Sequence, residues 1–453
     1  MDRRRFSKQV LTALGASALG PGVLGAGEGR SPGSGGPPAA PFPQTGARIN
    51  GRRLNRWLEE FSRFGRRGDG GVDRMAFSDA DLAGRGWVVA LMEEVGLEVR
   101  VDVAGNIIGT RAGTEAGLPP LMLGSHIDSV PAGGNYDGPL GSLGAIEVVE
   151  SLREAGVETR HPLEVVIFVN EEGGKTGSRV LAGEFRLQEL ELETASGFTI
   201  GEGIRRLGGD PDRLAEGRRV VGDAAGFLEL HVEQGQILER EGVTIGVVEG
   251  IVGIRRWTAT VHGAANHAGT TPMDQRRDAM LGAARLVEAV NRVVRSIPGS
   301  QVGTVGRIEA FPGVPNVIPG EVLMSIEVRA LAMETIESVM GGIGREAEII
   351  GRENGTPISL EEFYLSGAAP TDVRFRGWVE GAAEALGHSH RRMPSGAGHD
   401  AQSVAHFAPM GMIFVPSVGG LSHHPDEYSR PEDLEAGANV LLGALLRADR
   451  GLD

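Results

Sequence analysis

The chain has 453 residues, of which 40% are hydrophobic and 23% are charged, so it is long enough for two globular domains with ordinary cores. Its formal net charge of -15 argues against nucleic acid as a partner. The absence of cysteine excludes disulfides, thiolate metal ligands and a cysteine nucleophile. Any bound metal must therefore be held by His, Asp and Glu.

The chain begins with a basic segment and a weakly apolar run. The sequence RRRFSK at 3–8 precedes a run at 10–24 that Gly and Ala interrupt. This pattern is similar to a twin-arginine export signal, and the alternative is a basic N-terminus on a cytoplasmic protein. We expect a signal over 1–30, then a Pro/Gly-rich linker over 31–48, with export to the periplasm or the extracellular medium. No segment is long and apolar enough to predict a stable membrane span.

The folded part begins near Ile49 and alternates between helices and buried strands. Apolar residues at helical spacing predict helices over 54–64, 79–95 and 140–155. The alternation of apolar residues over 99–103 predicts a strand, and short apolar runs predict strands over 121–123, 165–169 and 227–232. Strands separated by helices indicate an α/β domain whose central sheet is flanked by helices.

The pattern changes near Gly250. A strand, helix, strand, strand, helix and strand are predicted over 256–262, 276–295, 302–309, 322–328, 333–350 and 358–365. This is the order of a ferredoxin-like α+β domain. The α/β pattern then resumes with elements over 372–386, 412–415 and 431–447. We therefore expect an α/β catalytic domain in two parts, 49–250 and 369–453, with a ferredoxin-like domain inserted at 251–368.

Candidate metal ligands stand at the ends of the predicted strands or in the loops that follow them. In an open α/β sheet the carboxyl ends of the strands form the ligand crevice, so we expect these side chains to meet there. They are His126, Asp128, Asp137, Glu171, Glu172, His231 and His423. Each of them taken singly fits an ordinary loop residue, and only the joint pattern favours a metal site.

The residue types suit a pair of divalent ions. His126 and Asp128 point the same way, so one can bind a metal while the other orients it. Asp137 lies in a Gly-rich loop, and a carboxylate can bridge two cations. Glu171 and Glu172 are adjacent and point in different directions, so one can be a ligand while the other faces the attacking water. Carboxylates this close would repel each other without a cation.

The motifs resemble the amidase/hydantoinase/carbamoylase branch of the M20 metallopeptidase family. This branch includes N-carbamoyl-L-amino-acid hydrolases, β-ureidopropionases and allantoate amidohydrolases. HVEQG and NHAGTTPM are specific to the branch, whereas the HxD element and the adjacent Glu pair are shared with the wider family. The matching stretches are GSHIDSVPAGGNYDGPLG, NEEG, LELHVEQG, GAANHAGTTPMDQRRDA, PNVIPG, SGAGHDA and MIFVPSVGGLSHHPDE.

The resemblance implies a role for each candidate. It implies that His126, Asp137 and His231 bind one metal ion. It implies that Asp137, Glu172 and His423 bind the other, with Asp137 bridging. Glu171 is then the general base, and Asp128 supports His126.

The resemblance also implies roles for residues that bind substrate. The inserted domain serves as lid and dimerisation domain in this branch, so we expect a homodimer. His267 corresponds to a residue that reaches the partner subunit's active site and stabilises the tetrahedral intermediate. Asn316 and Arg329 correspond to residues that bind the substrate carboxylate, and an Arg can do so with a bidentate fork. Gln234 corresponds to a position that contacts substrate.

We therefore expect an amidohydrolase that cleaves the carbamoyl or ureido C–N bond of an N-carbamoyl-L-amino acid. A metal-bound hydroxide would attack after Glu171 takes the proton. Imidazole and carboxylate ligands suit Zn, with Mn or Co as alternatives. Allantoate or another ureido acid is the alternative substrate. A dipeptidase or deacylase fits less well with HVEQG and NHAGTTPM, and a non-catalytic binding protein would have lost a ligand or the base.

The sequence also departs from the pattern of the branch. Gly173 to Thr176 follow the Glu pair where an aromatic and a basic residue are usual, Gln236 stands where Pro is common, and Glu327 stands where Asp is usual. These departures leave the proposed ligands intact and the exact substrate open. Four further histidines are expected at helix or loop surfaces without a role: His161, His388, His390 and His406.

Overall fold

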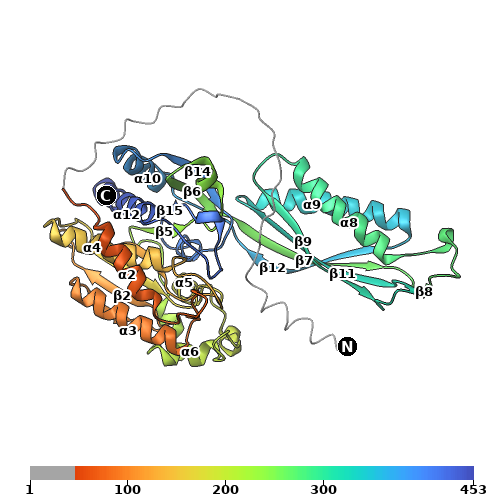
Figure 1. The fold of residues 1–453 in the computed structure, drawn as a ribbon, viewed down its shortest axis with the longest axis horizontal. Helices are drawn as coiled ribbons and strands as arrows, with labels where there is room; N and C mark the ends of the chain where they lie inside the picture. Colours follow the sequence, from red (N-terminus) through yellow and green to blue (C-terminus); the bar gives the residue numbers. More distant parts are fainter. Residues whose placement is uncertain (1–45, 453) are drawn as a thin grey trace, which may run out of the picture. The chain divides into compact units, whose positions relative to one another are not determined.

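Figure 1 shows the fold in a computed structural model, of which residues 46–452 are described. The predicted export signal and all but the last three residues of the predicted linker lie outside this part of the chain. The described chain divides into two compact units. The first extends to Glu249 and continues over Thr371–Met393 and from His399 onward, and the second comprises Gly250–Pro370 and Pro394–Gly398. None of the helices in the described part has the length and apolar character needed to cross a membrane.

The first unit is built on a mixed sheet with the strand order β1-β2-β4-β3-β5-β15-β6-β13, in which β14 also pairs with β6. Strands β4, β3, β5 and β15 run parallel to one another, and β2 and β6 flank them in antiparallel pairing. The strands are β1 (Glu98–Val101), β2 (Ile107–Arg111), β3 (Leu121–His126), β4 (Leu163–Phe168), β5 (Gly226–Val232), β6 (Ile245–Ile251), β13 (Ala369–Pro370), β14 (His390–Ser395) and β15 (Met410–Val415).

The helices of the first unit begin at residues that suit a helix N-terminus. The side chains of Asn50 and Ser78 accept backbone N–H groups in the first turns of α2 and α3, and Pro139 and Pro431 open α4 and α12. The α-helices are α2 (Gly51–Ser62), α3 (Asp79–Glu94), α4 (Pro139–Glu154), α5 (Thr176–Ala182), α6 (Ile200–Arg206), α7 (Ile237–Glu241), α10 (Val373–Ala385), α11 (Asp400–Val404) and α12 (Pro431–Gly451).

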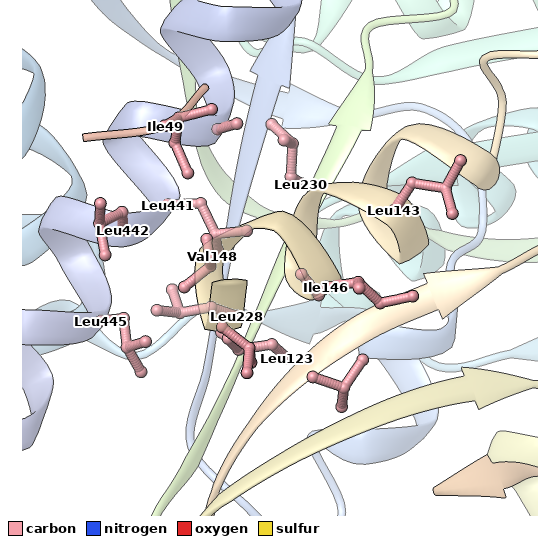
Figure 2. Close-up of a cluster of buried hydrophobic side chains, with 14 of the residues drawn as sticks. Ile49, Leu123, Leu143, Ile146, Val148, Leu228, Leu230, Leu441, Leu442 and Leu445 are labelled. Carbon is pink, nitrogen blue, oxygen red and sulfur yellow. The ribbon is translucent and has the colours of Figure 1, made fainter. Parts of the chain in front are cut away.

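The main core lies where α4 and α12 pack against β3 and β5 (Figure 2). Every side chain of this cluster is removed from water, and full burial of one such side chain stabilises the fold by about 1.5–3 kcal/mol. The cluster therefore anchors β3 and β5, the strands that carry His126 and His231. Its members include Leu123, Leu143, Ile146, Val148, Leu228, Leu230, Leu441, Leu442 and Leu445.

The second unit has the predicted ferredoxin-like order. Its antiparallel sheet has the strand order β12-β7-β11-β9, and α8 and α9 pack against it (Figure 1). Alternate residues of β11 are buried, as the sequence pattern predicts for a strand with one covered face. The elements are β7 (Gly253–His262), α8 (Ala279–Ser296), β9 (Val302–Phe311), β11 (Glu321–Ala330), α9 (Met333–Asn354) and β12 (Ile358–Ser366), with a separate pair of β8 (Asn266–His267) and β10 (Val317–Ile318).

One residue differs from expectation in its burial. His161, predicted at a surface, is fully buried. Its backbone N–H donates to Oδ1 of Asp449, and its Nδ1 lies 2.8 Å from the carbonyl oxygen of Pro119. These partners come from distant parts of the chain, so the local sequence does not indicate that the imidazole is enclosed.

Candidate metal centre

Four neighbouring parallel strands bring the candidate ligands to one edge of the sheet. Strand β3 ends at His126, β5 carries His231, and Glu171 and Glu172 follow β4. His423 lies in the loop after β15. Because β4, β3, β5 and β15 are adjacent and parallel, their carboxyl ends meet. The tertiary structure therefore gathers side chains that are far apart in the sequence.

Asp137 stands between two groups of ligands and faces each with a different oxygen atom. Its Oδ1 lies 3.2 Å from Nε2 of His231 and 3.6 Å from Nε2 of His126. Its Oδ2 lies 3.3 Å from Nε2 of His423, and that nitrogen lies 3.3 Å from Oε1 of Glu172. Two triads therefore share Asp137: one consists of His126, Asp137 and His231, and the other of Asp137, Glu172 and His423. In each triad the three ligand atoms lie within 4.8 Å of one another. This is the arrangement that a bridging carboxylate needs.

The two buried histidines present their Nε2 atoms to Asp137. Nδ1 of His126 lies 3.0 Å from the carbonyl oxygen of Asp128, and Nδ1 of His231 lies 2.9 Å from that of Val232. A carbonyl oxygen only accepts, so each Nδ1 donates and each neutral ring has its lone pair on Nε2. Nε2 of His231 is buried and has no hydrogen-bond partner among the described residues. A cation held between Asp137 and the two Nε2 lone pairs would give this buried nitrogen a partner.

The spacing of these atoms fits a divalent metal ion. Metal bonds of 2.0–2.2 Å to His nitrogen and carboxylate oxygen place two tetrahedral ligands about 3.4 Å apart. The separations of 3.2 to 3.6 Å around Asp137 are close to this value. The residues present, three imidazoles and two carboxylates in two triads with a shared Asp137, therefore fit a pair of such ions.

Without metal, the charges of the site perturb one another strongly. The pKa of Asp137 is held well below its usual value because the neighbouring His231, His126 and His423 outweigh the effect of burial. Burial lowers the pKa of His423, but hydrogen bonds to Asp137 and Glu172 outweigh it and raise the pKa to about 11. Protons thus occupy the positions that cations would fill.

Glu171 lies beside the two triads without belonging to either. Its Oε2 is 3.8 Å from Nε2 of His126. Burial, together with the nearby Asp400 and Glu172, raises the pKa of Glu171 well above its ordinary value. A carboxylate with a raised pKa that is not a ligand can accept a proton near neutral pH.

Asp128 contacts the Glu pair as well as His126. Its two carboxylate oxygens each accept a backbone N–H, from Glu171 and from Glu172, at 3.2 Å. Its Oδ1 is 3.6 Å from Nδ1 of His126, further than its own backbone carbonyl oxygen at 3.0 Å. Asp128 therefore fixes the turn that carries the Glu pair, a contact that the sequence does not indicate.

Asp137 also has hydrogen-bond partners that were not predicted as ligands: Gln234 was expected to contact substrate, and Ser422 and Glu427 were not among the candidates. The side chains of Gln234 and Ser422 donate to its Oδ2 at 2.6 and 2.8 Å. Glu427 is buried and accepts the backbone N–H groups of Tyr136 and Asp137 at 2.8 and 3.0 Å. Burial and the charge of Asp137 raise the pKa of Glu427 to about 7. Glu427 shapes the ligand loop, and it stands within the MIFVPSVGGLSHHPDE stretch that carries His423.

A second buried cluster, missed in the sequence, lies next to His231. The ring of His399 packs edge-on against that of His231, with centroids 4.5 Å apart. Oε1 of Glu229 accepts from the Ser125 hydroxyl at 2.7 Å, and its Oε2 accepts from the backbone N–H of Ala401 at 3.0 Å. Glu229, His231 and His399 also form a triad with metal-ligand spacing. The motif SGAGHDA contains His399, but no predicted strand leads into it.

The remaining predicted residues lie in the second unit. Nδ1 of His267 accepts the backbone N–H groups of Gly269 and Thr270 at 3.0 and 3.2 Å, so the neutral ring carries its proton on Nε2. Arg329 donates from Nε to Glu327 at 2.7 Å and from Nη1 to the carbonyl oxygen of Gly396 at 2.7 Å. Asn316 is exposed, and its backbone carbonyl accepts from Ala268.

The fold and the site define an α/β protein with a candidate two-metal centre at the carboxyl edge of its main sheet. Residues 122–447 match Peptidase family M20/M25/M40, and the chain belongs to this family. It is 39% identical over 408 residues to the N-carbamoyl-L-amino acid amidohydrolase of Geobacillus stearothermophilus, covering 89% of this chain and 100% of the relative.

Two further comparisons agree with this assignment. The chain is 38% identical over 403 residues to the ureidoglycolate hydrolase of Arabidopsis thaliana, covering 86% of this chain and 84% of the relative. It also matches the crystal structure of an amidase of the hydantoinase/carbamoylase family from Burkholderia multivorans. That match has a TM-score of 0.82 and 40% identity, covering 89% of this chain and 99% of the other. The protein is an amidohydrolase that acts on C–N amide bonds.

Proposed function

We propose that the protein hydrolyses the carbamoyl C–N bond of N-carbamoyl-L-amino acids. The observation that carries the proposal is the pair of triads bridged by Asp137, with Glu171 beside them as a carboxylate that is not a ligand. The relative from Geobacillus stearothermophilus, whose full length is covered, supports the substrate class.

His126, Asp137 and His231 would hold one divalent ion, and Asp137, Glu172 and His423 would hold the other. Zinc is the first choice for these ligands, with manganese or cobalt as alternatives. When bound, the ions polarise the scissile carbonyl group and lower the pKa of water. Both buried imidazoles are oriented before substrate arrives, because a backbone carbonyl oxygen accepts a hydrogen bond from Nδ1 of each ring.

Glu171 serves as the general base in this proposal. Its Oε2 takes a proton from the attacking water and then delivers it to the nitrogen of the leaving group. Asp128 holds the backbone of Glu171 and Glu172 through two hydrogen bonds, so the base and the ligand keep their separate directions. The products of a carbamoyl substrate are the free amino acid, ammonia and carbon dioxide.

The second unit would supply donors for the substrate. His267 carries a proton on Nε2, and in a homodimer it would donate to the carbonyl oxygen in the partner subunit's site as negative charge develops there. Arg329 and Asn316 would bind the substrate carboxylate. Glu327 pairs with Arg329 at 2.7 Å and so fixes the plane of the guanidinium group. Gln234 would contact the ureido group.

A second candidate substrate is a ureido acid such as ureidoglycolate or allantoate. The similarity to the ureidoglycolate hydrolase of Arabidopsis thaliana favours this alternative. The test is ammonia release from N-carbamoyl-L- and N-carbamoyl-D-amino acids, ureidoglycolate and allantoate, together with amino-acid release from dipeptides, each with and without a chelator. The highest kcat/KM on an N-carbamoyl-L-amino acid, abolished by the chelator, supports the proposal. A higher value on a ureido acid or a dipeptide contradicts the substrate, and activity that survives complete metal removal contradicts the mechanism.

A further inference from the structure

Arg74 is a buried cation that makes no direct ion pair, although the carboxylates of Asp81 and Asp128 act on it from a greater distance. Its side chain is 0% exposed, and no carboxylate oxygen in the described part of the chain lies within the 4.0 Å that defines an ion pair. Burial lowers the pKa of Arg74 to about 10. An unpaired buried charge is costly, and an apolar side chain of similar volume would avoid that cost. The guanidinium group of Arg74 therefore has a role that an apolar side chain of similar volume could not fill.

The guanidinium group of Arg74 binds three separate segments. Its Nε donates to the carbonyl oxygen of Ile127 at 2.6 Å, and its Nη1 donates to that of Phe64 at 2.9 Å. Its Nη2 donates to Oδ1 of Asn135 at 3.3 Å. The group also lies 4.1 Å from the centre of the Phe61 ring, at the end of α2. A planar fork can satisfy several acceptors at once, which an ammonium group cannot do in the same geometry.

Two of these segments carry ligands of the same proposed metal ion. Ile127 stands between His126 and Asp128, and Asn135 stands two residues before Asp137. The backbone adds a second link, because the N–H of Arg74 donates to Oγ of Ser129 at 2.9 Å and the N–H of Ser129 donates to the carbonyl of Arg74 at 3.0 Å. Arg74 thus ties the loop after β3 to the loop that carries Asp137.

We propose that Arg74 is a positioning residue that sets the spacing of His126 and Asp137 for the first metal ion. This inference rests on the proposed metal-dependent function. Arg74 touches neither ligand side chain and acts through the backbone at Ile127 and through Asn135. Because the Asp128 carboxylate also holds the Glu pair, a shift at Ile127 would spread to Glu171.

The test compares Arg74→Met with Arg85→Met. Arg85 is a second buried arginine, and its Nη2 donates to the carbonyl oxygen of Gly105, outside the metal centre. Arg85→Met therefore controls for the general effect of removing a buried guanidinium group. The measurements are Co²⁺ and Mn²⁺ affinity, the visible spectrum of the Co²⁺ protein, kcat and KM, and thermal unfolding of the metal-free chain. We expect Arg74→Met to weaken metal binding and lower kcat about 10- to 100-fold and to change the Co²⁺ spectrum, with little change in KM. Arg85→Met should lower the unfolding temperature and leave the spectrum and metal affinity unchanged.

Two further variants separate the possible outcomes. Asn135→Leu removes one acceptor of the fork and should shift the Co²⁺ spectrum in the same direction by a smaller amount. Arg74→Lys keeps the charge without the fork and should resemble Arg74→Met. The proposal is overturned if Arg74→Met binds Co²⁺ with wild-type affinity and spectrum, or if Arg74→Lys is fully normal. If Arg74→Met does not fold, a normal Asn135→Leu overturns it. A wild-type chain that binds no metal would instead refute the proposed function.

Discussion

Gly138 lies directly against the imidazole of His126. A Cβ atom on Gly138 would stand 2.4 Å from Cε1 and 2.5 Å from Nδ1 of that ring, and the backbone φ of Gly138 is +82°. Both the conformation and the space therefore require glycine between Asp137 and α4. The ligand loop can bring Asp137 back to His126 only because this position has no side chain.

Gly138→Ala should displace His126 and lower the affinity of the first metal site, formed by His126, Asp137 and His231, by more than about tenfold. The matched control is Gly117→Ala, because Gly117 has a similar φ of +85° but nothing within 4 Å of an added Cβ. The control should lose about 1 kcal/mol of stability through backbone strain and keep its metal. Metal content and affinity of the two purified variants check the prediction, and equal metal affinity in both would contradict it.

Glu171→Gln should abolish turnover while metal stays bound. Loss of the general base is expected to lower kcat by about 10²- to 10⁴-fold, because Gln cannot take the proton. Ammonia release and metal content are measured on the same sample. Glu172→Gln is the comparison, since Glu172 belongs to a ligand triad and its loss should reduce metal content. Loss of metal from the Glu171 variant alone would show that the two Glu roles are reversed.

A mixed dimer tests whether His267 acts across the subunits. Chains with His267→Ala and chains with Glu171→Gln should each be inactive alone. If His267 serves the partner subunit's site, each mixed dimer holds one complete site, and random mixing should restore about a quarter of wild-type activity. The measurement is ammonia release after the two variants are refolded together or co-expressed. No recovery in a demonstrated heterodimer would place His267 in its own subunit's site or outside the reaction.

Metal binding should release protons at neutral pH. In the metal-free chain the pKa of His423 is raised to about 11, so its imidazole carries a proton at pH 7 that a metal must displace. The apparent metal affinity should therefore rise by roughly tenfold per pH unit for each proton released. Calorimetric Mn²⁺ titrations in buffers of different ionisation enthalpy count the protons. Binding heats that do not depend on the buffer would contradict the assignment of His423 as a ligand.

Asp81 should make stability fall as the pH rises. Burial raises the pKa of Asp81 from 3.8 to about 6 in the folded protein, so the unfolded chain loses this proton first. The free energy of unfolding therefore decreases between about pH 4 and pH 6, by about 3 kcal/mol for a shift of this size. Asp81→Asn keeps an acceptor for the N–H of Phe77 and removes the buried charge.

This variant should be more stable than the wild type at pH 8 by up to about 3 kcal/mol and equally stable near pH 4. Urea unfolding of both proteins at the two pH values measures the difference. Asp69 is the control, because a hydrogen bond from Arg67 lowers the pKa of this exposed carboxylate, and Asp69→Asn should not gain stability at pH 8. A gain for Asp81→Asn that is the same at both pH values would contradict the argument.

Regular elements with a clear apolar period were predictable from the sequence. The helix predicted over 79–95 is α3 (Asp79–Glu94), and the alternation of Val322, Met324, Ile326 and Val328 marks β11. The strands β2, β6 and β14 were not predicted. All three contain Gly, Pro or charged residues. β6 and β14 pair with strands that are distant in the sequence, and β2 pairs with the distant β4 as well as with the neighbouring β1. Pairing of that kind leaves little trace in the local pattern.

The sequence by itself determined which residue types stand after which strands, and therefore that His126, Glu171, Glu172, His231 and His423 could share one edge of a sheet. Only the tertiary structure decided that Asp137 faces two triads with different oxygens, that Asp128 holds the Glu pair, and that Arg74, His399 and Glu427 surround them. The physical reason is the distance along the chain over which each feature is determined. Helix and strand periods are local, whereas the spacing of ligands and the burial of charges depend on contacts between segments that the chain brings together only on folding.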